Sequence, residues 1–426
     1  MTESLSLREI SKTTRPSIDR RGTQFERNGR IYRAFRDEPA ALIERLLGEP
    51  WLPELYEAGL IEFHRADVTV DGYSLVVEVP RIPFVTYPSE WPVAMLRDAG
   101  VLIARLGERL SAHGLGLQDA HPWNVLFRGS RPVFVDLGSI IEDATVTPAW
   151  VEEYRRTIVL PLALHGARMH GIADAVQGIE RGWIPRQLSR RRFRWFPPYY
   201  RWIARQAGSP PRFYRALEHY MRGRAGTGAV TAWSEYEQTL EKEHSLETIL
   251  GAIAPGRLLD VGANAGWFSR LAARLGNEVV AIDNDDRTLG SLYRLAAEEG
   301  LPVVPVRMDF MWPTGSAGFG LELRAAPDRL RCDTLVALAV LHHLVGYQRV
   351  TFESFAKVVD MFAARHAVIE FVPREDAHVA EWSLAAESWY SEDAFVAAMA
   401  PCFRLIQRLP SSPAPRVILS FERVED

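Results

Sequence analysis

Acidic residues and glycines follow strand-like segments at regular intervals in the second half of the chain. The segment Leu258–Ser269, LLDVGANAGWFS, has Asp260 in an apolar run, then Gly262 and Gly266 in a loop before a helix. The next apolar run ends at Asp283. A small-residue loop at the carboxyl end of a strand lets the backbone approach a ligand closely, and a carboxylate one strand later can accept hydrogen bonds from ribose hydroxyls. This pattern predicts a site for a nucleoside-containing cofactor.

Three further segments end in side chains that could contact a base or move a proton. The third apolar run ends in MDF, where Asp309 could accept from an adenine amino group beside the ring of Phe310. The fourth run, DTLVALAVLHHL, carries His342 and His343 near its end, and the fifth ends at Glu370. A histidine or carboxylate at this rim could take the proton of an alcohol acceptor, although the histidines could equally be architectural. With two adjacent histidines and no spaced carboxylate cluster, we expect no metal-dependent mechanism.

These motifs, in their order and at successive strand ends, resemble the class I S-adenosylmethionine-dependent methyltransferases over about residues 236–426. A dinucleotide site is the rival, but an acid such as Asp260 suits a cationic ammonium–sulfonium ligand better than a pyrophosphate. Asn264 replaces the usual third glycine, which gives the GxNxG form of a subset of that family. The resemblance implies S-adenosylmethionine as cofactor, with Asp260, Gly262, Asn264 and Gly266 at its methionine part, Asp283 at the ribose, Asp309 and Phe310 at the adenine, and Leu338 and Ala339 at the floor near the methyl group.

The first half carries a different motif, LQDAHPWNVLFRGSRPVFVDLGS. Four residues separate Asp119 from Asn124, and Asp136 opens a D-L-G sequence after a short strand. This spacing resembles the catalytic and metal loops of protein-kinase-like phosphotransferases. In such enzymes a carboxylate orients a hydroxyl, while an amide and a second carboxylate hold Mg²⁺. The resemblance implies a nucleotide or Mg²⁺ site at these three residues.

The kinase-like motif departs from the family pattern. Leu117 stands where the loop histidine usually does, and no convincing glycine-rich phosphate loop precedes residue 29. No lysine exists at the third-strand position, so Arg33 or Arg36 would have to pair with Glu44 and with phosphates. A planar guanidinium does not simply replace an ammonium group. We therefore expect a degenerate kinase-like domain that does not phosphorylate.

Hydrophobic periodicity predicts an α/β chain whose second half is Rossmann-like, with a mostly parallel seven-stranded sheet closed by a hairpin. We expect a flexible leader at 1–22, a kinase-like α+β domain at 23–175, a helical connector at 176–235 and a methyltransferase domain at 236–426. The strands expected in the second half are Arg257–Val261, Glu278–Asp283, Pro302–Met308, Thr334–Val340, Ala367–Phe371, Phe403–Leu409 and Arg416–Phe421. In the first half we expect strands at Gly29–Phe35, Leu60–His64 and Tyr73–Pro80 and helices at Pro39–Leu47 and Val93–His113.

Composition restricts the function classes further. The 426 residues are 47% hydrophobic and 24% charged, with a net charge of −4, which is typical of a soluble globular protein and does not favour nucleic-acid binding through bulk positive charge. The basic, aromatic run Arg186–Trp202 could be an anionic-substrate or nucleic-acid patch with aromatic stacking, or a solvated helix face whose aromatic residues dock on a neighbouring domain. Cys332 and Cys402 cannot form a disulfide scaffold, which favours a reducing cytoplasm. We expect no membrane span, and the polar Met1–Arg21 lacks the apolar core of a secretory signal.

Nearly the whole chain resembles one bacterial family that includes a rhizobial nodulation protein. The leading hypothesis is S-adenosylmethionine-dependent O-methylation of a small molecule or glycan, with an inactive kinase-like domain. Two alternatives stay open: a bifunctional kinase–methyltransferase acting on a bacterial polysaccharide, and a non-enzymatic pseudokinase scaffold that only binds ligand. The sequence does not indicate an oligomeric state.

Overall fold

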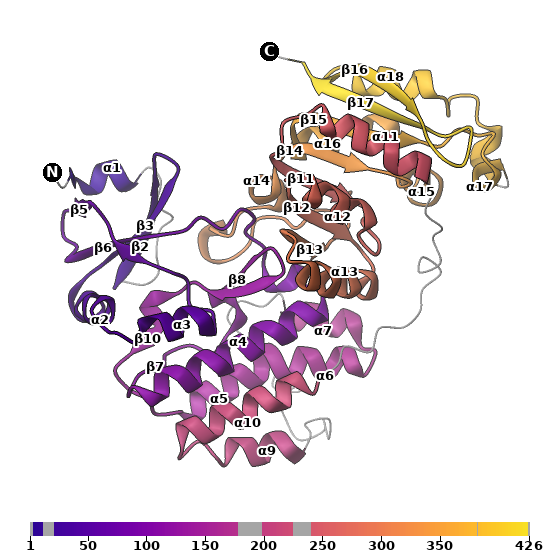
Figure 1. Ribbon diagram of the computed structural model, residues 1–426. Coiled ribbons are helices and arrows are strands. Elements are labelled where there is room, and N and C mark those ends of the chain that lie inside the picture. The colour runs from indigo at the N-terminus through magenta and orange to yellow at the C-terminus, as the bar shows by residue number, and fades with distance from the viewer. Residues whose placement is uncertain (1–2, 12–20, 178–197, 225–239, 381, 425–426) are drawn as a thin grey trace. The chain divides into compact units, whose positions relative to one another are not determined.

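The computed structural model describes residues 3–11, 21–177, 198–224, 240–380 and 382–424, and the chain forms two compact units (Figure 1). Unit 1 comprises Met1–Ile82, Tyr87–Phe127 and Pro132–Thr227. Unit 2 comprises Gly228–Asp426 and two short segments, Pro83–Thr86 and Arg128–Arg131. Residues 1–2 and 12–20 of the predicted leader, residues 186–197 of the basic aromatic run, and the predicted junction at 235–236 lie outside the described residues.

Unit 2 contains a seven-stranded sheet in the order β13-β12-β11-β14-β15-β17-β16. Neighbours from β13 to β15 are parallel, and β17 is antiparallel to both β15 and β16. The prediction of a mostly parallel seven-stranded sheet with a closing hairpin is confirmed. The strands are β11 (Arg257–Val261), β12 (Glu278–Asp283), β13 (Val303–Arg307), β14 (Cys332–Ala337), β15 (Ala363–Phe371), β16 (Phe403–Pro410) and β17 (Val417–Arg423).

The central strands of unit 2 are continuous apolar runs because helices cover both faces of the sheet. On one face, Leu250, Leu271 and Leu292 join a single core cluster with strand residues. These leucines come from α11 (Leu240–Gly251), α12 (Trp267–Arg274) and α13 (Asp286–Glu299), which lie beside the sheet in Figure 1. On the other face, Phe352 and Phe395 contact Phe371 of β15. They belong to α16 (Phe352–Phe362) and α18 (Glu392–Met399).

The strand order of unit 2 reverses beside β11. The chain passes from β11 to β12 and β13 on one side, then crosses to β14 on the other. In open α/β sheets such a reversal separates the loops that follow the two central strands and leaves a crevice at their carboxyl ends. The topology therefore predicts that a ligand of unit 2 binds beyond the ends of β11 and β14.

Unit 1 opens with β1 (Glu3–Leu5), which pairs in parallel with β5 (Val68–Val70), and with α1 (Leu7–Ser11). A four-stranded antiparallel sheet follows, in the order β2-β3-β6-β4. The predicted strand Leu60–His64 is wrong, because within it only His64 belongs to a strand and Leu60 makes an isolated bridge to Phe134. Leu60, Ile61 and Phe63 are apolar because they are buried in the core, not because they pair in a sheet. The elements around this sheet are β2 (Gly22–Arg27), β3 (Arg30–Phe35), α2 (Asp37–Leu47), α3 (Leu52–Ala58), β4 (His64–Arg65) and β6 (Leu75–Val79).

The rest of unit 1 is largely helical. The long helix α4 (Val93–Ala112) packs along α10 (Pro210–Arg222). Along the chain, α4 is followed by β7 (Gly116–Leu117), the hairpin of β8 (Val125–Arg128) and β9 (Arg131–Phe134), and β10 (Ile140–Ile141). The helix α5 (Pro148–Tyr154) and the π-helical turn η4 (Arg155–Val159) come next, before α10. The unit combines antiparallel strands with helices, and its likeness to protein kinases stays a prediction.

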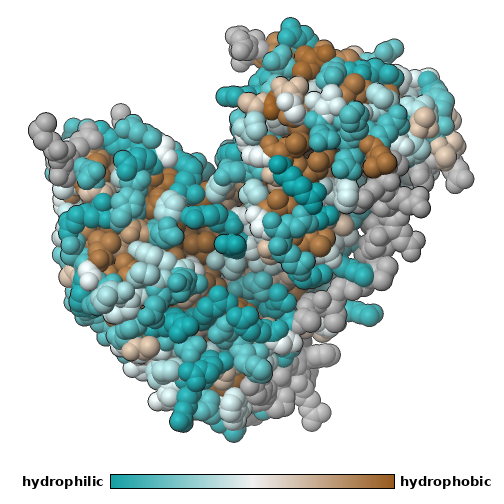
Figure 2. All heavy atoms as spheres, in the orientation of Figure 1, coloured by the Kyte–Doolittle hydropathy of each residue, from teal (hydrophilic) through white to brown (hydrophobic). Residues whose placement is uncertain are grey.

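Hydrophobic side chains fill the interior of each unit. Hydrophilic residues cover most of the molecular face shown in Figure 2, with hydrophobic residues in smaller groups among them. Among the described residues, no helix combines the length and apolar character that a membrane crossing requires.

Candidate functional site

A cavity of about 390 Å³ lies in unit 2 at the carboxyl ends of β11, β12 and β14, where the strand order reverses. Its volume is within the range of pockets for small organic ligands. Three successive loops form its walls: Gly262–Ala265 with Trp267 and Phe268, Asp283–Asp285 with Thr288, and Leu338–Val340 with His343, Leu344, Tyr347 and Gln348. The cavity therefore brings together Gly262, Asn264, Asp283, Leu338, Ala339 and His343 from the sequence-predicted set.

The loop after β11 depends on glycine at two positions. Gly262 has φ +69°, and a Cβ atom there would lie 2.3 Å from Cγ2 of Val340. Gly266 has φ +75°, and its Cβ would lie 2.0 Å from a methyl carbon of Leu292. Both positions combine a left-handed backbone with close approach of a neighbouring side chain, which an L-residue with a Cβ cannot accommodate without displacement. Gly266 is not on the cavity wall, and it serves by letting α12 begin against α13.

Asp283 ties the loop after β11 to the loop after β12. Its Oδ2 atom accepts the backbone N–H of Asn264 at 2.8 Å, and its Oδ1 atom accepts that of Asp285 at 2.9 Å. Burial raises the pKa of Asp283, while the hydrogen bonds from these amides act in the opposite direction. Each carboxylate oxygen can accept more than one hydrogen bond, so the side chain can still receive ligand hydroxyls.

Asp260 lies behind the glycine loop and does not line the cavity. It is 3% exposed, and the hydroxyl of Ser269 donates a 2.5 Å hydrogen bond to its Oδ2 atom. Burial raises the pKa of Asp260 to about 7, the Ser269 bond lowers it, and nearby Asp283 raises it further. A cation in the cavity would favour the ionised form of this carboxyl group.

The two adjacent histidines occupy different environments. His343 lines the cavity from α15 (Leu341–Gln348), and its ring stacks on that of Tyr347 with centroids 5.8 Å apart. His342 is 3% exposed, stacks on Trp382 and does not line the cavity. Burial, with a smaller contribution from His343, lowers the pKa of His342 to about 2, so its imidazole is neutral at physiological pH. Ala339, just before this helix, has φ +55°, an uncommon conformation for a non-glycine residue.

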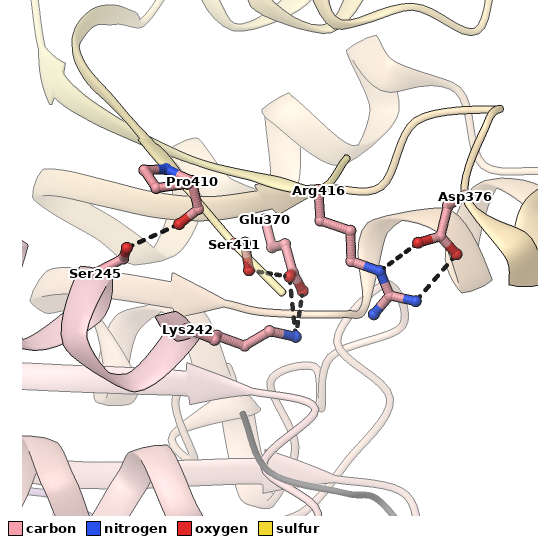
Figure 3. Close-up of polar contacts among 7 residues, drawn as sticks. All are labelled: Lys242, Ser245, Glu370, Asp376, Pro410, Ser411 and Arg416. Atoms are coloured by element: carbon pink, nitrogen blue, oxygen red, sulfur yellow. Dashed lines mark hydrogen bonds and ion pairs between the residues drawn. The ribbon is translucent and has the colours of Figure 1, made fainter. Parts of the chain in front are cut away.

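The structure does not place Glu370, a predicted proton acceptor, on the cavity. Glu370 is fully buried, and Lys242 of α11 lies 2.9 Å from its Oε1 atom and 3.0 Å from Oε2 (Figure 3). The hydroxyl of Ser411 donates a third hydrogen bond to it at 2.6 Å. A second buried pair, Arg416 with Asp376, is bidentate, at 2.7 and 3.0 Å. A carboxylate already neutralised by a buried ammonium group is a structural anchor rather than a base.

Asp309 and Phe310, predicted to contact adenine, are also absent from the cavity wall. Phe310 is buried, with its ring against Phe355 and Phe362 of α16. The Oδ1 atom of Asp309 accepts the backbone N–H of Met311 at 2.8 Å and so caps its own turn. The aromatic residue after β13 points into the core because α16 presents two phenylalanines to it, which the strand pattern could not reveal.

Sequence reasoning missed several lining residues. Asn284 and Asp285 follow Asp283 directly, and Asp285 also caps α13 by accepting the N–H groups of Arg287 and Thr288. The polar sequence DNDD, which follows the apolar run of β12, could have predicted that these two residues also border the site. Tyr347 and Gln348 lie one turn beyond His343 and Leu344, and residues four apart share a helix face, so helical spacing could have predicted them.

In unit 1, the predicted nucleotide or Mg²⁺ residues have other partners. Oδ1 of Asp136 is 2.8 Å from a guanidinium nitrogen of Arg33 and also accepts the N–H of Gly138. Glu44 pairs with Arg65, and not with Arg33 or Arg36 as a working kinase site would require. Arg36 instead stacks over the ring of Tyr73.

The other two predicted residues of this set also lie in unit 1. Asn124 is 9% exposed, and Asp119 lies near His121 and Glu153, with one ligand-capable atom of each within 4.8 Å of the others.

The chain matches no known protein-family model. It is 26% identical over 463 aligned residues to the nodulation protein NoeA of Rhizobium meliloti (strain 1021), and the alignment covers 96% of this chain and 95% of NoeA. The relative found along the whole chain is thus a rhizobial nodulation protein, as the sequence predicted.

The similar solved structures include methyltransferases. The magnesium protoporphyrin IX methyltransferase ChlM of Synechocystis PCC 6803, with bound S-adenosylmethionine, is 15% identical at a TM-score of 0.31, covering 45% of this chain and 88% of ChlM. The bifunctional kinase-methyltransferase WbdD is 18% identical at a TM-score of 0.31, covering 43% of this chain and 37% of WbdD.

Proposed function

We propose that unit 2 binds S-adenosylmethionine and transfers its methyl group to an acceptor molecule. The observation that carries this proposal is the cavity at the strand-order reversal, where a glycine loop is held by the partly buried carboxylate of Asp283. A second carboxylate, Asp260, lies behind the same loop. Two carboxyl groups around one small cavity favour a ligand that carries positive charge.

The size and charge of the cavity disfavour a dinucleotide. A volume of about 390 Å³ lies near the lower end for organic-ligand pockets and suits one nucleoside with an amino-acid arm. A pyrophosphate in the cavity would meet like charges at Asp283 and Asp285, which line its wall. In this proposal Asp283 receives the ribose hydroxyls, the Gly262–Asn264 backbone faces the methionine part, and Asn284 and Asp285 border the base.

S-adenosylmethionine supplies a methyl group on a positively charged sulfur, whose displacement leaves a neutral thioether. The chain's main contribution is to hold the acceptor in line with that methyl group, since orientation alone can lower a barrier by several kcal/mol. His343 is the one predicted base that lines the cavity, because His342 is buried and Glu370 is neutralised by Lys242. We assign to His343 the removal of a hydroxyl proton, which fits O-methylation of a small molecule or glycan.

Calorimetry of the full chain with S-adenosylmethionine, S-adenosylhomocysteine and NAD⁺ tests the cofactor assignment. Saturable binding of the first two and none of NAD⁺ supports it. Binding of NAD⁺ alone, or of none of the three, overturns it.

An acceptor screen with tritiated cofactor tests methyl transfer. With the first acceptor found as substrate, the His343→Gln variant is expected to transfer methyl groups roughly 10²-fold more slowly or worse, within the range for loss of a general base. Its affinity for S-adenosylhomocysteine should stay near that of the wild type. Unchanged transfer in this variant removes the role of His343. Complete lack of transfer by the wild type to any acceptor leaves unit 2 as a ligand-binding scaffold.

Unit 1 is proposed not to phosphorylate. The guanidinium of Arg33 engages Asp136, the carboxylate that would hold Mg²⁺ in a kinase. We expect no ATP turnover by the full chain, and turnover that disappears in Asp136→Ala would show a bifunctional enzyme instead.

A further inference from the structure

Two carboxylates and one imidazole converge in unit 1, outside the proposed methyl-transfer site. Asp119 and His121 lie between β7 and β8, and Glu153 lies near the end of α5. One ligand-capable atom from each residue lies within 4.8 Å of the other two. All three side chains are partly buried.

We propose that Asp119, His121 and Glu153 bind a divalent transition-metal ion. Imidazole together with carboxylates is a donor set that suits Mn²⁺, Fe²⁺ or Zn²⁺, whereas Mg²⁺ prefers oxygen ligands and retained waters. Metal–ligand bonds of about 2.0–2.2 Å place three ligand atoms of one ion about 3–3.6 Å from one another. The ligand atoms lie within 4.8 Å of one another in the ion-free chain, so the side chains would rotate to close by up to about 1–2 Å, and waters or substrate would complete the coordination.

Hydrogen bonds hold the two ligand-bearing segments together. Oε2 of Glu153 accepts the backbone N–H of Ala120, between the other two ligands, at 2.8 Å. The backbone N–H of Asp119 donates to the hydroxyl of Ser139 at 3.2 Å. After Glu153, the hydroxyl of Tyr154 donates to a backbone carbonyl of α4 at 2.8 Å, and the π-helical turn η4 follows. The two segments that carry the ligands are therefore held together before an ion arrives, which lowers the cost of binding it.

The imidazole of His121 has a nitrogen atom that could coordinate a metal ion. Its Nδ1 atom is buried and has no hydrogen-bond partner among the residues that the structure describes. Buried polar atoms are normally satisfied by a partner, and a histidine nitrogen is a common metal ligand. A bound ion at the cluster would satisfy the imidazole and offset the repulsion between Asp119 and Glu153 at the same time.

This site differs from the kinase-type site predicted at Asp119, Asn124 and Asp136. The Asp136 carboxylate is engaged by the guanidinium of Arg33 at 2.8 Å. A metal cation at Asp136 would meet that positive charge at close range. His121 and Glu153 are not part of that ion pair. The two sites share Asp119 and can be told apart by their other ligands.

Titration of the metal-free full chain with MnCl₂, followed by the electron paramagnetic resonance signal of free Mn²⁺, tests the proposal. We expect one ion per chain. His121→Ala and Glu153→Gln should each weaken Mn²⁺ binding by at least about 10-fold, the lower end for loss of a supporting contact at a metal site. Glu152→Gln, at the exposed neighbouring acid, and Asp136→Asn should leave the dissociation constant within about 2-fold.

Pulsed resonance of the bound ion gives a measurement that does not depend on variants folding. A nitrogen coupling in the wild-type spectrum shows imidazole coordination and supports the site. Absence of that coupling, or no Mn²⁺ binding at about 1 mM, overturns it. If Asp136→Asn loses Mn²⁺ binding while His121→Ala and Glu153→Gln retain it, the ion binds at the kinase-type site, and the proposed site is overturned.

Discussion

The backbone amide of Asn264 donates a 2.8 Å hydrogen bond to the carboxylate of Asp283. Asn264 lies in the loop after β11, and Asp283 is the last residue of the neighbouring strand β12. The same carboxylate accepts a second amide, that of Asp285, from the loop after β12. One side chain therefore fixes the shape of two cavity walls before any ligand is bound. Its loss should affect both the loop geometry and the hydroxyl contacts of the ligand.

Asp283→Ala is expected to weaken S-adenosylhomocysteine binding by at least about 10-fold, because hydrogen bonds to a charged acceptor contribute about 1.5–3 kcal/mol each. Calorimetry of the full chain measures this. The control is Glu298→Ala, an exposed acid on α13 outside the cavity, which should bind like wild type. Equal affinities for wild type and Asp283→Ala would contradict the role of this carboxylate.

Gly262→Ala should weaken S-adenosylhomocysteine binding by about 10-fold or more and lower the thermal midpoint. The new Cβ atom would lie 2.3 Å from Val340, in a left-handed backbone that costs an L-residue about 1–2 kcal/mol. Gly251→Ala is the matched control, since a Cβ atom at the end of α11 meets nothing within 4 Å. The packing argument fails if the two alanine variants behave alike in calorimetry and thermal denaturation.

Asp260 should make the stability of the ligand-free protein fall as pH rises. Its pKa is about 7 in the folded chain against 3.8 ordinarily, chiefly because of burial, so the folded state holds the proton more tightly than the unfolded state. This contribution is fully present below about pH 4 and is lost as pH rises through about 7. Thermal midpoints between about pH 5 and 8 measure it, and Asp260→Asn should flatten the profile.

The same titration predicts that affinity for the cationic cofactor increases with pH across this window. Binding should release a proton from Asp260, which calorimetry in buffers of different ionisation enthalpy detects. An affinity and a proton balance that do not change between wild type and Asp260→Asn would show that this carboxyl group does not sense the ligand.

Lys242→Met should destabilise unit 2 by about 3–5 kcal/mol, because it leaves the buried Glu370 carboxylate without its partner. Lys242→Met/Glu370→Met should recover most of that loss, since it removes both charges. Arg408→Met breaks the exposed pair with Glu392 and should cost less than about 1 kcal/mol. Urea denaturation of the three variants gives the comparison, and a double variant as unstable as the single one would argue against the buried ion pair.

Much of unit 2 could be predicted from the sequence because its parallel strands are buried on both faces. Such strands are apolar runs with sharp ends, so β11 and β12 match their predicted bounds. The glycine loop and Asp283 could also be predicted, because both lie directly beyond those ends. Local sequence patterns are enough to predict site residues that lie directly beyond the ends of parallel strands.

Contacts between distant residues could not be predicted in this way. Glu370 meets a lysine 128 positions earlier in the chain, and no local pattern distinguishes a paired carboxylate from a free one. Phe310 turns inward because of phenylalanines on a later helix. Arg33 reaches Asp136 rather than Glu44, since the sheet of unit 1 sets which charges meet.

The burial of Lys242 also makes its reactivity a measure of how often α11 opens. The chain has three lysines, and Lys242 is 1% exposed whereas Lys357 is exposed on α16. An amine-acylating reagent should modify Lys357 rapidly, but it can reach Lys242 only in molecules whose α11 has detached from the sheet. The acylation rate at Lys242, read by peptide mass spectrometry, therefore reports how often this helix opens under native conditions.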